Sequence, residues 1–203
     1  MNIIAKTLLI STLAAVTLPQ ALVAAPTKPA AKAATGATSS WNVDKGASRV
    51  GFRSSFGGGA FDGLFRRWDA RIQFDPKALD KSSVVAVIDL ASAATGDESR
   101  DQALPTEDWF FTSKFPRATF VAKQFKTIGT DRYQAIGTLN IRGVTRPAVL
   151  PFTLQINGDQ ALMKGSLVID RKAFGIGQGQ FASAESVPFA VQVNVTVKAQ
   201  RAR

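Results

Sequence analysis

Apolar and polar side chains alternate with a period of two residues along most of the chain between Trp41 and Lys198. The last stretch is the clearest, because every odd-numbered residue from Val187 to Val197 is Val or Phe. Successive side chains of a β-strand point to opposite faces of the sheet, so this pattern predicts strands with one buried face. We therefore expect an all-β fold over this part of the chain.

Eight segments carry the strand signal, and turn motifs such as Gly57-Gly58-Gly59, Arg142-Gly143 and Asn157-Gly158-Asp159 separate them. The segments are residues 48–53, 68–75, 83–90, 118–122, 133–141, 150–156, 161–169 and 187–197. Pro147 and Pro151 have no backbone N–H for a sheet ladder, so their strand is expected to be an edge or bulged there. Eight antiparallel strands can close into a small barrel, whose interior is filled by side chains or holds one small ligand.

One stretch breaks the two-residue period. Acidic residues follow Gly96 and Pro105 ends the segment, which predicts a short helix between them. Thr106 is the expected N-cap of a second short helix that reaches Phe111. We therefore expect one or two short helices at one end of the barrel.

The N-terminal 40 residues differ from the rest in composition. Lys6 precedes an apolar run over residues 7–18, and small residues follow Pro19, which predicts a secretory signal peptide over residues 1–25. The run is shorter than the roughly 20 residues of a membrane-spanning helix, although a retained anchor is the alternative. Residues 26–40 are rich in Ala, Pro and Lys and predict a disordered linker. The barrel domain is then expected over residues 41–198, a basic tail over 199–203, and the mature protein in a bacterial periplasm.

The chain contains no Cys and no His. This excludes disulfides, thiolate nucleophiles, imidazole bases and metal sites built from these residues. An enzyme would have to use Tyr133, lysines or carboxylates, and acidic residues at a helix N-terminus are already explained by the helix dipole. We predict no catalytic residue, no metal and no cofactor.

The net charge of +10 favours anionic partners. Three of the lysines precede residue 41, which leaves a net charge of +7 on the predicted domain and tail. A phosphorylated head group or an anionic membrane surface would suit this charge. Nucleic acid would suit it as well, but a secretory leader sends the protein away from nucleic acid, and no nucleic-acid partner is predicted.

Three blocks of residues carry a further signal by their order and spacing. They are Thr95-Gly96-Asp97 with Arg100-Asp101, Leu104, Asp108-Trp109-Phe110 and Phe115-Pro116-x-Ala118-x-Phe120; Gly137-x-Leu139 with Arg142-Gly143-Val144-Thr145-x-Pro147; and Asp170-Arg171-x-x-Phe174-Gly175-Ile176-Gly177. With Trp41-x-Val43-Asp44 before them, these blocks resemble the YceI family of bacterial polyisoprenoid-binding proteins. The chain departs from the family pattern at Gln178-Gly179-Gln180-Phe181, where an aromatic residue, often Trp, is expected close to an acidic one.

The resemblance implies an eight-stranded, lipocalin-like antiparallel barrel around a long apolar tunnel. The expected ligand is the isoprenoid chain of a polyprenyl phosphate or a ubiquinone-type lipid, bound without catalysis. Alternation alone favours an ordinary packed core, because it shows which face is apolar and not whether the space behind that face is empty. Taken with the resemblance, it selects as lipid-binding candidates Val50, Phe52, Trp68, Ile72, Phe74, Trp109, Phe110, Phe120, Leu139, Ile141, Leu150, Phe152, Leu154, Leu167, Ile169, Phe174, Val191 and Val193.

Arg100 and Arg171 are the candidates for a charged head group, since a guanidinium binds phosphate through two parallel hydrogen bonds. The alternative is structural: Arg100 would pair with Asp97 or Asp101, and Arg171 would form an ion pair at a strand end. Other classes stay open at this point, namely a filled barrel without ligand, a small-molecule enzyme or stress-related barrel, and an outer-membrane barrel. A homodimer is also left open.

Overall fold

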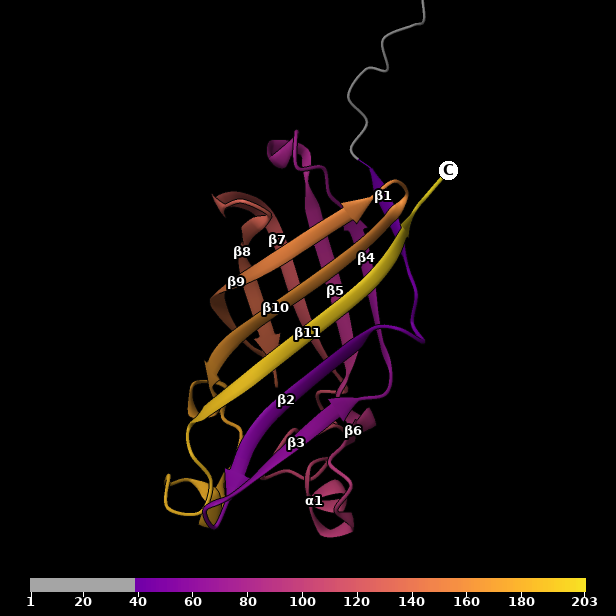
Figure 1. Ribbon diagram of the computed structural model, residues 1–203. Helices are drawn as coiled ribbons and strands as arrows, with labels where there is room; N and C mark the ends of the chain where they lie inside the picture. Colours follow the sequence, from indigo (N-terminus) through magenta and orange to yellow (C-terminus); the bar gives the residue numbers. More distant parts are fainter. Residues whose placement is uncertain (1–38) are drawn as a thin grey trace, which may run out of the picture. The chain divides into compact units, whose positions relative to one another are not determined.

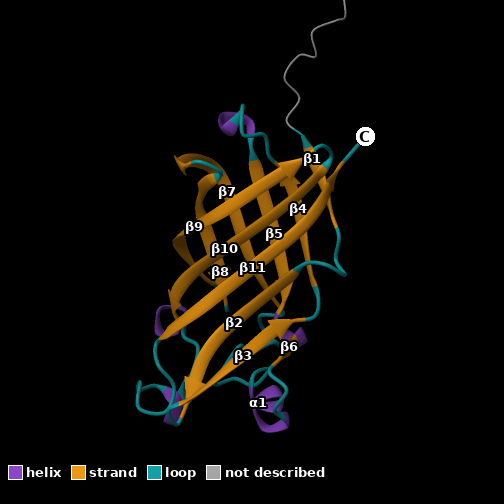
Figure 2. Ribbon diagram, in the orientation of Figure 1, coloured by secondary structure: helices purple, strands orange, loops and turns teal. Residues whose placement is uncertain are grey.

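Eight antiparallel strands close into a barrel in the computed structural model, which describes residues 39–203 (Figures 1 and 2). The predicted signal peptide and nearly all of the predicted linker lie outside the described residues. The ring runs β1-β4-β5-β7-β8-β9-β10-β11, and β11 pairs with β1 to close it. Its strands are β1 (Ser40–Val43), β4 (Trp68–Gln73), β5 (Ser83–Asp89), β7 (Arg117–Gly129), β8 (Arg132–Ile141), β9 (Val144–Asn157), β10 (Gln160–Asp170) and β11 (Ala190–Arg201).

Three further strands extend the sheet from β11: β2 (Arg49–Phe56), β3 (Gly59–Phe65) and β6 (Ala93–Ala94). β11 is long enough to pair with β1 through Ala199–Arg201 and with β2 through Gln192–Thr196. The segment 48–53, predicted as one of eight barrel strands, is therefore β2 outside the ring, and β1 takes its place. Residues 199–201, at the start of the predicted basic tail, belong to β11.

Turn residues fix several hairpins. β8 and β9 are joined by Arg142 and Gly143, which have φ of 52° and 77°. Two successive positive φ values match the twist of a tight hairpin, and Gly tolerates this conformation without steric cost. The Asn157-Gly158-Asp159 motif likewise forms the tight turn between β9 and β10.

β9 behaves as its two prolines predict. It pairs with β8 through Val144–Thr153, whereas its pairing with β10 covers only Phe152–Asn157. Pro147 and Pro151 lie in the part of β9 that precedes this pairing, where the strand is an edge on one side. The sequence expectation of an edge at the prolines is confirmed.

Short helical segments lie mainly at the end of the barrel that carries α1 (Glu98–Ala103), called the lower end here because it lies at the bottom of Figure 1. The predicted first helix is confirmed, with the Asp97 carboxylate accepting a hydrogen bond from the Arg100 N–H at 2.9 Å. The predicted second helix is wrong. Residues 106–111 form turns, because the Thr106 hydroxyl donates to the Ala103 carbonyl instead of capping a new helix, and Phe111 has a positive φ of 50°. The other short segments are the 3₁₀ turns η1 (Leu79–Lys81), η2 (Leu90–Ser92), η3 (Arg171–Phe174) and η4 (Gly179–Phe181).

Two clusters of buried side chains occupy the barrel interior. The upper cluster, at the β1 end, is centred on Trp41, Phe74 and Phe152. The lower cluster contains Phe52, Phe110 and other side chains near α1. Trp68 and Val195 pack against both clusters, which makes the apolar interior continuous from one end to the other.

Candidate functional site

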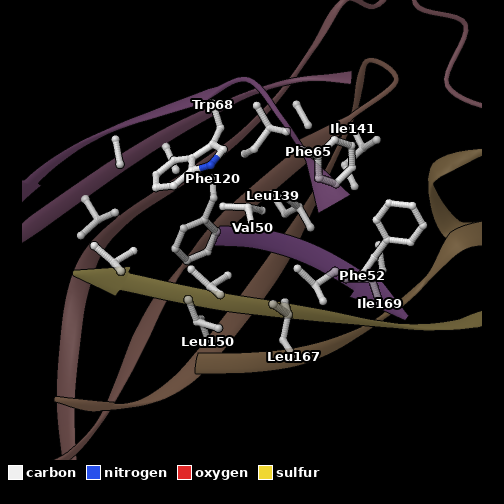
Figure 3. A pocket seen from close by; sticks show the side chains of 18 of the residues that line it. Val50, Phe52, Phe65, Trp68, Phe120, Leu139, Ile141, Leu150, Leu167 and Ile169 are labelled. Atoms are coloured by element: carbon white, nitrogen blue, oxygen red, sulfur yellow. The ribbon is translucent and has the colours of Figure 1, made fainter. Parts of the chain in front are cut away.

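A cavity of about 240 Å³ lies inside the barrel and is lined by every strand of the ring, together with β2 and β3. On β11 the lining residues are alternate positions from Val191 to Ala199, a span of roughly 27 Å at 3.3–3.4 Å per residue. In Figure 3 the side chains of Trp68, Phe120 and Leu167 approach the same space from different strands. The cavity is therefore elongated. Packed protein cores contain few voids larger than a water molecule, so this interior is not the filled core that alternation alone favoured.

The lining of the cavity is apolar. Apart from the three tryptophan indoles, its only polar side chains are those of Ser54 and Arg171. Apolar cavities of roughly 150 Å³ stay free of water and bind small apolar molecules such as benzene. A longer cavity of the same character suits a longer apolar molecule.

All but one of the lipid-binding candidates selected from the sequence line this cavity. The exception is Phe174, which is buried in the lower cluster on η3 but does not reach the cavity. Those that line the cavity are Val50, Phe52, Trp68, Ile72, Phe74, Trp109, Phe110, Phe120, Leu139, Ile141, Leu150, Phe152, Leu154, Leu167, Ile169, Val191 and Val193.

Arg171 lines the lower end of the cavity and is only 1% exposed. Its guanidinium donates hydrogen bonds to five backbone carbonyls, which are those of Pro188 (3.1 Å), Ile176 (2.8 Å), Gly177 (3.4 Å), Ser183 (2.8 Å) and Val187 (2.8 Å). Burial lowers the pKa of Arg171, and the nearby charge of Asp170 opposes this shift. Since a guanidinium has five N–H groups, none is left to bind a phosphate in this arrangement. Arg171 instead fixes the loop between β10 and β11 over the lower end.

The sequence matches the protein-family model of the YceI-like domain over residues 41–199. The chain belongs to the YceI family.

Among YceI relatives, a UPF0312 protein of Pseudomonas savastanoi is 29% identical over 134 residues, which cover 63% of this chain and 70% of that protein. Protein YceI of Escherichia coli O157:H7 is 34% identical over 97 residues, which cover 48% of this chain and 50% of that protein.

Two solved structures share the fold. BcnA of Burkholderia cenocepacia has a TM-score of 0.76 and 30% identity, over 78% of this chain and 100% of that one. A polyisoprenoid-binding domain from Saccharophagus degradans has a TM-score of 0.64 and 17% identity, over 82% of this chain and 100% of that one. The likeness to the second protein concerns the fold alone.

The first YceI-like block covers the lower end of the cavity. Trp109 and Phe110 line the cavity, with the Trp109 ring 4.9 Å from that of Phe181. Phe181 comes from the stretch that departs from the family pattern. Arg142 holds this cover in place, because its Nη1 donates to the carbonyls of Glu107 and Trp109 at 2.7 Å each.

Arg100 does not line the cavity. Its guanidinium lies 4.5 Å above the ring of Phe61, which does line the cavity, and 3.6 Å from the Asp97 carboxylate. The structural alternative with Asp97 is thus the one observed.

Burial opposes a low pKa at Asp101, but hydrogen bonds from the Thr95 hydroxyl and from backbone N–H groups lower the pKa of this carboxyl overall.

Aromatic rings pack closely in the upper cluster. Phe74 lies 5.3 Å from Phe125, 5.5 Å from Tyr133 and 5.8 Å from Phe152, measured between ring centroids. Burial, with a contribution from the charge of Asp131, raises the pKa of Tyr133. The tyrosine considered as an enzyme residue is therefore held neutral among aromatic rings.

The lining residues that make the cavity wide were not predicted from the sequence. These are alanines on inward-facing positions, among them Ala70, Ala86, Ala118, Ala135 and Ala161. The signal was available, since a small side chain at an inward position leaves space that a larger one would fill.

Within residues 39–203 there is no group of three acidic side chains that could hold a metal ion, and no helix is long and apolar enough to cross a membrane.

Proposed function

We propose that this YceI-family protein binds a lipid by holding its isoprenoid chain in the barrel cavity, and that it sequesters or carries that lipid in the periplasm. The observation that carries the proposal is the elongated apolar cavity. The description of the Saccharophagus degradans domain as polyisoprenoid-binding supports it. The periplasmic location rests on the signal-like residues 1–25, and the net charge of +7 supports contact with an anionic membrane from which the lipid is taken.

An isoprenoid chain gains enough from burial to bind in such a site. At about 0.8 kcal/mol per buried carbon, each five-carbon unit contributes roughly 4 kcal/mol of gross transfer free energy. Ordering a flexible chain cancels part of this gain, so the gross value is an upper bound. A few buried units are therefore expected to supply most of the binding free energy.

The test is native mass spectrometry of the purified full chain, combined with organic extraction and lipid analysis. We expect an adduct that extraction removes and that contains an isoprenoid chain. The stripped protein should then bind an added prenyl quinone. Repeated preparations without lipid, together with no binding of added prenyl quinone or polyprenyl phosphate, would refute the proposal.

A further inference from the structure

Two buried polar atoms at the lower end of the barrel have no hydrogen-bond partner. They are the Ser54 Oγ and the Trp109 Nε1, and they are the only buried side-chain nitrogen or oxygen atoms without a partner in residues 39–203. Both residues line the same apolar cavity. Buried polar groups in folded proteins are nearly always hydrogen-bonded, so each exception calls for an explanation.

The two residues belong to the same end of the cavity. Ser54 pairs with Phe61 near the end of β2, and the following turn is tied to the β10–β11 loop by the hydrogen bond from the Gly57 N–H to the Ser186 carbonyl. The Trp109 ring lies 5.9 Å from the guanidinium carbon of Arg171, which anchors the same loop. The unpaired atoms therefore both lie at the lower end of the cavity, near the loop that Arg171 anchors.

The charge at this end argues against an anionic head. Arg171 is the only charged residue among those lining the cavity in the described part of the chain, and its N–H groups already donate to backbone carbonyls. An ionised phosphate moved from water to this place would lose its hydration without gaining a guanidinium. A neutral oxygen would cost far less to bury, and it could accept hydrogen bonds from a hydroxyl and an indole N–H.

We propose that Ser54 and Trp109 form a subsite for the neutral, hydrogen-bond-accepting head of the bound lipid, such as a carbonyl oxygen. This inference rests on the proposed function and adds the head-group class, with neutral carbonyl heads preferred to phosphates. The subsite gives each of the two unpaired donors a hydrogen-bond acceptor. The bound head completes their hydrogen bonding.

The test compares three ligands with the same prenyl chain and different ends: a hydrocarbon, a methyl ketone and a monophosphate. For the wild-type protein we expect the ketone to bind about 3- to 10-fold more tightly than the hydrocarbon, the range of one neutral hydrogen bond, and the phosphate to bind less tightly than the ketone. Ser54→Ala and Trp109→Phe should each reduce or remove the advantage of the ketone over the hydrocarbon when the two ligands are compared on the same variant.

A matched control separates this effect from general damage. Ser55→Ala removes a hydroxyl from the residue next to Ser54, which faces the opposite side of β2 and does not line the cavity. This variant should retain the preference for the ketone. Ser54→Ala should not lower the melting temperature of the lipid-free protein, because it deletes an unpaired buried group.

The outcomes are distinguishable. Equal affinity for all three ligands, unaltered by the Ser54 and Trp109 variants, would refute the subsite and leave the proposed function standing. A preference for the phosphate would also refute the subsite. No binding of any of the three ligands would refute the proposed function and the subsite together.

Discussion

Filling the cavity should block lipid binding without unfolding the barrel, and Ala86 is the position at which to test this. Ala86 lies in the middle of β5, lines the cavity, and pairs with Ala70 on β4 and Phe120 on β7. Ala86→Phe adds a phenyl ring, and a cavity of roughly 150 Å³ is enough to hold benzene. The new ring therefore fits into the 240 Å³ that is free and takes up space that the lipid chain would otherwise occupy.

The size of the effect follows from the carbon atoms that the ring displaces. Loss of one five-carbon unit removes up to about 4 kcal/mol of gross transfer free energy, and the reduced ordering cost returns part of it. We expect a loss of roughly 2–4 kcal/mol, or about 30- to 1,000-fold in affinity. The melting temperature should stay within a few degrees of wild type, because the added ring fills existing space instead of overpacking a filled core.

The assay is a titration of lipid-free protein with a prenyl quinone, with circular dichroism and thermal melting as the folding check. Val85→Phe is the matched control, since Val85 is the adjacent residue on β5, is 37% exposed and faces outward. The control should bind like wild type. A folded Ala86→Phe variant that retains wild-type affinity would show that the lipid does not occupy this cavity.

Three further predictions concern stability. Arg171→Lys should cost about 2–4 kcal/mol in urea denaturation and raise hydrogen exchange in the β10–β11 loop, because an ammonium cannot replace five donors; unchanged exchange would contradict the anchoring role. The pKa of Asp101 is lower in the folded protein than its ordinary value of 3.8, so the ionised carboxyl stabilises the fold at pH values above 3.8. This contribution is lost as the pH falls through the folded-state pKa of Asp101. Asp101→Asn should thus be less stable than wild type at pH 7, and thermal melts should show the difference shrinking below about pH 4. Gly137→Ala should destabilise by at least about 1–3 kcal/mol, because a Cβ there would collide with the Val121 carbonyl, whereas Gly46→Ala has room and should be nearly neutral in the same denaturation assay.

Alternation was sufficient to predict most of the barrel, because one apolar and one polar face repeat over long strands such as β8 and β11. It failed where the segment was short. β1 has only four residues, too few to display a period, and so the strand that closes the ring was missed. β2 shows good alternation but pairs outside the ring, since β11 accommodates β1 and β2 one after the other.

The cavity was harder to predict than its walls. The large inward-facing side chains were identified from their alternate positions along each strand. The free volume of the cavity, however, depends on inward-facing alanines such as Ala70 and Ala86. The role of Arg171 could not be read from the sequence, because its partners are backbone carbonyls of an irregular loop and backbone groups carry no residue signature. The same holds for the unpaired Ser54 and Trp109, since only the folded chain shows which polar atoms lack a partner.

Photo-crosslinking with a prenyl chain that carries a photoreactive group tests the location of the lipid most directly. The crosslinked residues would be mapped by mass spectrometry of the digested protein. We expect crosslinks on inward-facing positions of β11, such as Val193 and Val195, and none on the outward-facing neighbours Gln192 and Asn194. Crosslinks confined to outward-facing residues or to surface loops would contradict the central claim that the barrel interior holds the isoprenoid chain.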